Sequence, residues 1–555
     1  MAPQAAAGTA GPSPAPGGPV APQAAAGTAG PSPAPGGAAT AVAPAPSNVQ
    51  DVPHAATPPG PLDAGLLAAA RDAVLGEAGR LGCAHAELRA ERIRSQQARL
   101  RDGRLEGAAD DTEVGLGVRV VVDGAMGFAA TVAMTTDEAA ALVRKAVDAA
   151  RVIARAGGVP VELADEPGHG ALTWASPYRI DPVDVPLSDK VGLLADWSGR
   201  LLSDDGVDHV TAEVLAVTED TFYADLSGTE ATQRRVRVHP VVEALALDPD
   251  GGFETMRTVA PPVGRGWEYL EGDGWDWDAE LVELPGLLAA KVRAPSVDAG
   301  DYDLVIDPTN LWLTVHESIG HATELDRALG YEAAYAGTSF ATFDQLGSLQ
   351  YGSGVLHVTG DRTTAHGLAT VGIDDEGVPG QSFDLVRDGV LVGYQLDRSI
   401  AASSGLGASN GCAFADSPLH VPIQRMANVS LQPADGDGPT TDELIGGVDH
   451  GLYIVGDKSW SIDMQRYNFQ FTGQRFFRIE HGRLAGQVRD VAYQATTTDF
   501  WGAMEAVGGR STYLLGGAFN CGKGQPGQVA PVSHGCPAVL VRGIRILNTR
   551  QESGR

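Results

Sequence analysis

The sequence predicts an α+β protein, in which a mixed α/β amino-terminal domain precedes a β-rich, barrel-like carboxy-terminal domain. Up to about residue 290, segments with the apolar spacing of helices alternate with strand-like segments. Beyond that point, short apolar runs separated by Gly-rich turns dominate, as in barrels and curved sheets. A chain of 555 residues is also too long for one ordinary core. We therefore expect domains over residues 61–290 and 291–555.

The first sixty residues differ from the rest, and we expect residues 1–60 to be a disordered tail. They are mostly small residues and proline, and the run APQAAAGTAGPSPAPGG occurs in them twice. Such a composition cannot offset the entropy lost on ordering. The first basic residue is Arg71, so the positive start of a secretory signal is missing.

The remaining composition favours a cytoplasmic protein. No run of eighteen apolar residues suggests a membrane span. The 4 cysteines of this long chain do not make a disulfide framework, which fits a reducing compartment. The formal net charge of -30 would repel nucleic acids and anionic membranes, so neither is an expected partner.

Amino-terminal elements follow from hydrophobic periodicity. Leu62–Leu81 has helical spacing, and Thr135–Ala156 returns to it with Thr136 and Asp137 as expected caps. The segment Gly115–Thr131 reads as a hairpin around an Asp-Gly turn. Further strands are expected at Ala86–Leu105, Val114–Val122, Glu213–Val217 and Gln233–Glu243.

Carboxy-terminal elements are predicted to be mainly short strands. A helical stretch at Pro285–Asp298 leads into a buried strand at Tyr302–Ile306, and another helix is expected near His316. The strands expected after it are Leu356–Val358, Val390–Tyr394, Val421–Pro422, Gly451–Val455 and Asn468–Ile479.

One motif indicates metal chemistry. Two histidines bracket a glutamate as His316-Glu317-x-x-x-His321, and imidazoles are good zinc ligands beside a carboxylate that can accept a proton from water. Positions five apart lie about 140° apart on a regular helix, so both histidines meet one ion only if the helix widens or ends between them. Gly320 makes such a distortion easier.

Two histidines do not hold zinc tightly, so a third ligand must lie elsewhere. The candidates are Cys521, in a Gly-rich turn beside Lys523, and the nearby His534 and Cys536. Residue chemistry alone does not choose among these three.

At these residues the sequence resembles the TldD/PmbA family of metallopeptidases, specifically its TldD-type members, which carry the HExxxH motif. Similar blocks recur in the family's order over roughly residues 62–548. They are HESIGHATELD at 316–326, GTSF at 337–340, DDEGVPG at 374–380, DGVLVGYQLDR at 388–398, QRMANVSL at 424–431, DHGLYI at 449–454 and CGKGQPGQ at 521–528.

The resemblance implies zinc held by His316, His321 and Cys521, with Glu317 as the catalytic glutamate. It also implies cleavage of unfolded polypeptides or precursor peptides, by a homodimer or a heterodimer with a PmbA-type subunit. The chain departs from the family pattern at 402–417, at 459–471 and at the SHGCP run, 533–537, which leaves substrate preference open.

The sequence therefore predicts a zinc-dependent peptidase in which Glu317 is the general base. Two alternatives remain. One is a zinc hydrolase of a small amide, which would need a small closed pocket. The other is a non-catalytic subunit of the PmbA type, against which the intact motif argues.

Overall fold

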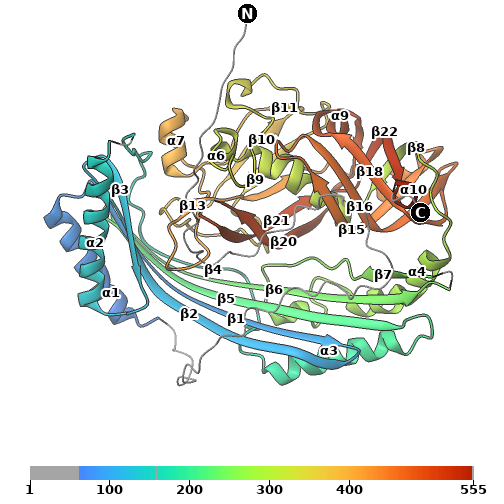
Figure 1. The fold of residues 1–555 in the computed structure, drawn as a ribbon, viewed down its shortest axis with the longest axis horizontal. Helices are drawn as coiled ribbons and strands as arrows, with labels where there is room; N and C mark the ends of the chain where they lie inside the picture. Colours follow the sequence, from blue (N-terminus) through green and yellow to red (C-terminus); the bar gives the residue numbers. More distant parts are fainter. Residues whose placement is uncertain (1–61, 158, 250, 525, 553–555) are drawn as a thin grey trace, which may run out of the picture.

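A long curved sheet forms the amino-terminal part of the computed structural model, which describes residues 62–157, 159–249, 251–524 and 526–552 (Figure 1). The expected tail at 1–60 lies outside these residues. Seven strands pair in the order β3-β2-β1-β5-β6-β4, with β7 on β6, and only the β4–β6 pair is parallel. The strands are β1 His85–Arg101, β2 Arg104–Val122, β3 Ala125–Thr131, β4 Gly170–Ala175, β5 His209–Asp225, β6 Thr229–Leu247 and β7 Phe253–Arg257.

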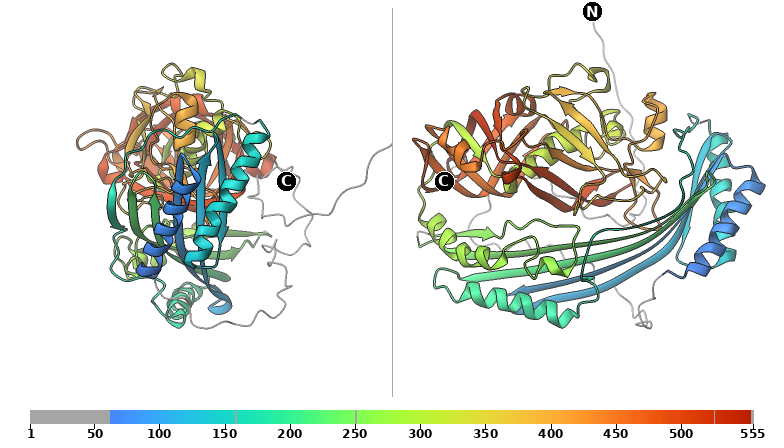
Figure 2. Two further views of the ribbon diagram at one scale, coloured as in Figure 1. Left: turned by 90° about the vertical axis from the view of Figure 1, so that its left-hand side faces the viewer. Right: turned by 180° about the vertical axis from the view of Figure 1, so that it is seen from behind.

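Four helices cover the outer face of this sheet at its two ends (Figures 1 and 2). α1 (Ala64–Leu81) and α2 (Thr136–Arg155) enclose one apolar core with β1, β2 and β3, while α3 (Leu187–Leu202) and α4 (Trp277–Arg293) enclose a second with β5 and β6. The carboxy-terminal half lies within the concave side of the sheet.

The concave face of the sheet is polar because it meets charged groups of the carboxy-terminal half. Along β1, Ala86, Leu88 and Ala90 point into the helix-covered core. The intervening side chains point the other way, and Arg89 donates to Asp375 at 2.8 Å. This alternation explains why β1 is buried on both faces at its start.

The carboxy-terminal half contains a closed five-stranded barrel. The ring runs β15-β8-β22-β18-β16 and closes through the β15–β16 pair, with β17 added on β16 and β19 on β22. A large core of aliphatic and aromatic side chains belongs to this half. The strands are β8 Gly300–Ile306, β15 His450–Ile462, β16 Asn468–Glu480, β17 Arg483–Val488, β18 Val491–Thr496, β19 Met504–Val507 and β22 Val539–Asn548.

Smaller sheets and short helices surround the barrel. One sheet has the order β11-β10-β9-β14, and β12–β13 and β20–β21 form hairpin-like pairs. Their bounds are β9 Val358–Asp361, β10 Ser382–Arg387, β11 Val390–Leu391, β12 Ala413–Phe414, β13 Ile423–Gln424, β14 Asn428–Leu431, β20 Leu514–Lys523 and β21 Gln528–Cys536. The helices are α5 Pro308–Val315, α6 Leu325–Ala328, α7 Arg398–Ser404, α8 Thr441–Gly446, α9 Thr497–Gly502 and α10 Thr549–Glu552. None of the helices in the described ranges has the length and apolarity of a membrane span.

The predicted fold class is confirmed, and so is the hairpin, whose turn residues Asp123 and Gly124 both have positive φ. Several boundaries were wrong. The strand expected to reach Leu105 ends at Arg101, because Asp102 and Gly103 turn the chain into β2. The cap of α2 is Thr135, whose hydroxyl accepts from the amide of Glu138.

The predicted helix at Pro285–Asp298 begins too late in the sequence. α4 begins at Trp277 with Asp276 as its cap, and Pro285 lies inside it. Proline is usually found at a helix boundary, yet Pro285 lies about two turns inside α4. In the short strands, β13 lies two residues after the expected Val421–Pro422, and β9 shares only Val358 with the expected strand.

Candidate metal centre

The motif histidines lie where a helix changes its winding. α5 starts directly after barrel strand β8, and the side chain of Asp307 caps it by accepting from the amide of Thr309 at 3.0 Å. Residues His316–Gly320 then form a π-helical turn, in which the amide of His321 donates to the carbonyl of His316. This widened turn is what the five-residue spacing required, since it brings both histidines to one side.

Side chains from other elements satisfy the carbonyl groups of the widened turn. Tyr351 donates its hydroxyl to the carbonyl of Ser318. Thr323 donates to the carbonyl of Ile319 at 2.8 Å, and Gln395 donates to that of Gly320 at 2.7 Å. These bonds compensate the local loss of regular helical hydrogen bonding.

Gly320 has a different role from the one expected. Its backbone is ordinary right-handed helix, with φ of -52° and ψ of -60°, so its conformational freedom is not used. A Cβ at this position would lie 2.6 Å from Sδ of Met426. Any larger residue here would have to displace the end of the Met426 side chain, which packs beside the histidines.

Cys521 comes from a distant strand. It lies on β20, not in the turn that the sequence predicted, and the pairing of β20 with β21 is irregular between Ala518 and Cys521. Its Sγ is 3.6 Å from Nε2 of His321, and one ligand atom each from His316, His321 and Cys521 all lie within 4.8 Å of one another. All three side chains are buried.

These three donors fit zinc. Zinc takes thiolate at about 2.3 Å and imidazole at about 2.05 Å, so a tetrahedral arrangement separates the sulfur and nitrogen by roughly 3.6 Å. The contact between Cys521 and His321 has that length. A donor set of three leaves one tetrahedral position for water or substrate.

Hydrogen bonds fix which nitrogen of each histidine is free. His534 donates from Nδ1 to the carbonyl of Val429 at 2.8 Å, so its Nε2, 2.7 Å from Nδ1 of His316, acts as the acceptor. On the other side, Glu324 accepts from Nδ1 of His321 at 2.8 Å. Both His316 and His321 therefore keep the proton on Nδ1 and leave the Nε2 lone pair available to a metal.

The electrostatic surroundings of the site support the protonation states inferred from these hydrogen bonds. Burial strongly lowers the pKa of His534, which keeps it neutral. Burial alone would raise the pKa of Glu324, but Lys523, His321 and Arg327 together outweigh it and hold that pKa well below the usual range. For Cys521, burial opposes ionisation, but His321 and Arg425 lower the pKa of the thiol overall. The thiolate form favours metal binding.

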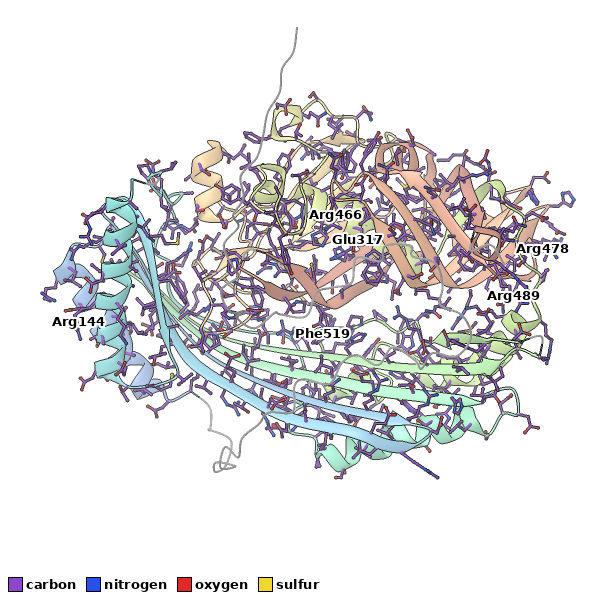
Figure 3. All side chains as sticks on the ribbon, viewed as in Figure 1. Arg144, Glu317, Arg466, Arg478, Arg489 and Phe519 are labelled. Atoms are coloured by element: carbon purple, nitrogen blue, oxygen red, sulfur yellow. The ribbon has the colours of Figure 1, made fainter. Side chains whose placement is uncertain are left out.

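Glu317 lies beside an arginine of a neighbouring loop, Arg466 (Figure 3). Nη1 of Arg466 lies 2.7 Å from Oε2 of Glu317, and both side chains are largely buried. Burial raises the pKa of Glu317, but Arg466, the two motif histidines and Arg327 together outweigh it and lower the pKa, so the carboxylate stays ionised at neutral pH. Arg466 itself adopts positive φ in the turn between β15 and β16.

The structure thus brings together the three expected ligands His316, His321 and Cys521. Glu317 lies in the same π-helical turn as His316, and both histidines act on its pKa. His534, weighed earlier as a ligand, contacts His316 instead, and Cys536 points elsewhere, with its Sγ 3.5 Å from the carbonyl of Pro308. Sequence reasoning missed Glu324 and Arg466. Glu324 lies three residues after His321, a spacing that places side chains on one helical face.

Known proteins share both this fold and this sequence pattern. Residues 299–548 match the family described as PmbA/TldA metallopeptidase C-terminal domain, and residues 86–151 match PmbA/TldA metallopeptidase domain 1. The chain belongs to the TldD/PmbA family. The match to domain 1 covers the segment from β1 to α2, and the match to the C-terminal domain covers the barrel strands and the residues of the candidate centre.

Relatives within the TldD/PmbA family carry metalloprotease names. A metalloprotease of Methanothermobacter thermautotrophicus is 29% identical over 84% of this chain and 96% of its own length. A metalloprotease TldD homolog of Haemophilus influenzae is 25% identical over 81% of this chain and 90% of its length. A zinc metalloprotease TldD homolog of Saccharolobus solfataricus is 25% identical over 49% of this chain and 58% of its length.

Solved structures share the fold. TldE from Thermococcus kodakarensis superposes with a TM-score of 0.62 at 16% identity, covering 86% of this chain and 99% of that one. A protein from Thermotoga maritima reaches a TM-score of 0.67, also at 16% identity, covering 86% and 99%. At this identity the likeness concerns the fold alone.

Proposed function

We propose that the protein is a zinc-dependent peptidase of the TldD type. The observation that carries the proposal is the convergence of two imidazoles and one thiol from segments 200 residues apart, with Cys521 Sγ 3.6 Å from His321 Nε2. The metalloprotease names of its relatives, one of them a zinc metalloprotease, point the same way. We further propose unfolded polypeptides or precursor peptides as substrates.

In this proposal His316, His321 and Cys521 hold the metal. When bound there, zinc supplies Lewis-acid chemistry, because it polarises a carbonyl group and acidifies water. Glu317 accepts the proton of the attacking water and passes it to the leaving amine. Arg466 orients the carboxylate of Glu317 through their hydrogen bond at 2.7 Å and contributes to the lowering of its pKa.

Location and assembly are further parts of the proposal. All four cysteines are free thiols, which agrees with a reducing cytoplasm. Assembly as a homodimer, or as a heterodimer with a PmbA-type subunit, stays a prediction from the family resemblance, and so does the division into domains at residue 290.

Zinc content per chain tests the metal site without any assumption about substrate. The expected result is about one zinc per chain, lost on Cys521→Ser. The matched control is Cys536→Ser, since that buried thiol lies outside the ligand cluster and should leave the zinc content unchanged. If protein purified without chelator and offered zinc binds none, the non-catalytic alternative takes precedence.

Peptide cleavage then separates the two enzymatic alternatives. Unfolded polypeptides should be cleaved by the zinc-loaded protein, and Glu317→Gln should abolish the cleavage while leaving zinc bound. Turnover of small amides without cleavage of polypeptides would support the alternative, a zinc hydrolase of a small amide.

A further inference from the structure

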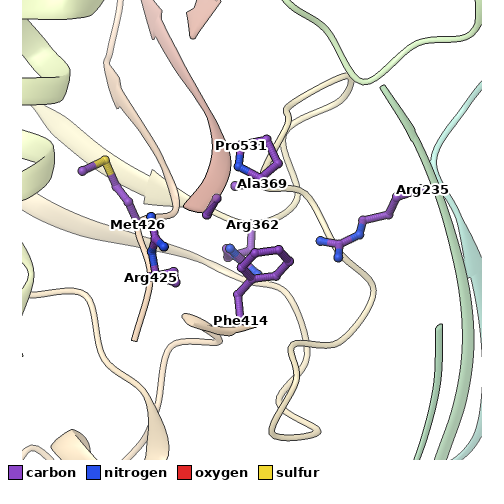
Figure 4. A pocket seen from close by; sticks show the side chains of 8 residues that line it. Arg235, Arg362, Ala369, Phe414, Arg425, Met426 and Pro531 are labelled. Carbon is purple, nitrogen blue, oxygen red and sulfur yellow. The ribbon is translucent and has the colours of Figure 1, made fainter. Parts of the chain in front are cut away.

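A small buried cavity lies where the curved sheet meets the carboxy-terminal half (Figure 4). Arg235 reaches it from β6, Arg362 follows β9, Arg425 follows β13, and Phe414 of β12 lies among them. The free volume is about 10 Å³, which is room for roughly one particle of the size of water. None of the residues assigned to the metal centre lines this cavity.

The charges around the cavity are unbalanced. Arg235 is compensated, because Glu219 lies 2.5 Å from its Nη2. Arg425 donates only to neutral carbonyl groups, those of Gln528 at 3.0 Å and of Cys521. Within the described part of the chain, no carboxylate forms an ion pair with Arg425 or Arg362.

Of the three arginines, Arg362 has buried donor groups without a hydrogen-bond partner and no ion pair within the part of the chain that the structure describes. Only 2% of the residue is exposed, and neither Nε nor Nη2 has a hydrogen-bond partner among the described residues. Two carboxyl groups that act electrostatically on Arg362, those of Asp374 and Asp375, already have other hydrogen-bond partners. Asp374 accepts from three backbone amides, and Asp375 pairs with Arg89.

Burying a guanidinium without a counter-charge is costly, and arginine cannot avoid the cost by losing its proton. Water in the cavity would satisfy one or two donors but would leave the charge of Arg362 uncompensated, and that of Arg425 balanced only by the more distant Cys521 thiolate. A bound anion satisfies the donors and balances the charge together.

We propose that this cavity is a binding site for one small monovalent anion of halide size, held between Arg362 and Arg425. The volume excludes phosphate or sulfate, which carry four oxygens. It also excludes the carboxylate of a peptide, since the cavity has no room for the attached chain. The ring of Phe414, with the guanidinium of Arg235 5.2 Å from its centre, closes one wall without adding a negative charge.

The anion would support the metal centre indirectly. Arg425 donates to the main-chain carbonyl of Cys521, so an anion that fixes Arg425 also fixes the segment of β20 that carries this thiol. The site is built from side chains outside the proposed catalytic set, and its existence does not depend on the proposed peptidase activity.

Bromide is the direct probe, because it resembles chloride and scatters anomalously. Crystals of the full chain grown with bromide should show an anomalous peak between the guanidinium groups of Arg362 and Arg425. The absence of an anomalous peak there at saturating bromide would overturn the proposal.

Thermal unfolding gives an independent readout in solution. The protein, exchanged into gluconate, should gain Tm on replacing gluconate with chloride at constant ionic strength, since chloride binds the folded state only. Arg362→Met should lose this chloride-specific gain. Arg99→Met, which alters a half-exposed arginine paired with Glu106 and Glu213, should keep it.

An equal gain in Arg362→Met and in the unaltered protein would mean a general salt effect and would refute the site. Should Arg362→Met fail to fold, the bromide experiment on the unaltered protein decides alone.

Discussion

Replacement of His534 by phenylalanine tests how the metal ligands are oriented. His534 is fully buried and accepts the Nδ1 proton of His316 at 2.7 Å. Phenylalanine has a similar ring but no acceptor, so the Nδ1–H of His316 would be left buried and unpaired. His316 is itself only 5% exposed, and water therefore does not replace the lost partner.

The size of the effect follows from that lost bond. An unsatisfied buried donor costs about 1–3 kcal/mol, and loss of a partner behind a metal-binding histidine costs about 10–100-fold in metal affinity. The two ranges agree, because about 1.4 kcal/mol corresponds to tenfold. We expect the zinc Kd of His534→Phe to rise by about 10–100-fold.

A competition titration against a chromophoric chelator measures this Kd. His534→Gln is the matched control, because its side-chain carbonyl can accept the proton of His316 and should retain more of the affinity. Thermal unfolding of the metal-free variants separates loss of fold from loss of metal. A zinc Kd of His534→Phe within twofold of the unaltered value would refute the assigned orientation of His316.

Three further predictions concern catalysis and acid stability. Glu317→Gln should lower kcat by at least about 100-fold with zinc content unchanged; activity within tenfold of the original would contradict the role of the carboxylate. Arg466→Met should lower kcat/KM by about 10-fold, since it removes a charge-assisted hydrogen bond, whereas Arg478→Met, on an exposed pair, should not. Burial lowers the pKa of His239 from 6.5 to about 4. The folded state holds His239 neutral, whereas the unfolded chain can protonate it below about pH 6.5. The free energy of unfolding is therefore undiminished above pH 6.5 and falls as the pH is lowered toward 4. Urea unfolding should show that the free energy of unfolding falls by on the order of 1–3 kcal/mol over that interval, and by less in His239→Phe. An equal dependence on pH in the variant and the unaltered protein would exclude His239 as the cause.

Local patterns predicted most of the fold. The long amphipathic helices and the Asp-Gly hairpin follow from short-range spacing, which is why α1, α2 and the β2–β3 pair were found. The boundary errors arise where tertiary packing overrides propensity. Pro285, for example, is tolerated within α4, and the amino-terminal half of β2 is exposed and polar, so it lacked the apolar pattern of a strand.

The site was predictable only in part. The spacing of His316 and His321 required a widened helix, and the structure has one. The choice of Cys521 over His534 and Cys536 came from family resemblance, because thiol and imidazole groups are both suitable zinc ligands and all three residues lie within one short segment of the sequence. The contact of Arg466 with Glu317 joins residues separated by 149 positions. No local pattern encodes such a contact.

The distance along the chain between the metal ligands also sets the order in which the site is made. His321 and Cys521 are 200 residues apart, with Cys521 the later of the two in the chain. At a synthesis rate of about 5–20 residues per second, a ribosome needs about 10–40 s to pass from one to the other. During that time the emerging chain has the histidines but no thiol to complete the centre. Under the proposed function, the chain would thus be inactive while it is itself unfolded, and would gain activity only after β20, which lies outside the barrel, has brought Cys521 to the histidines.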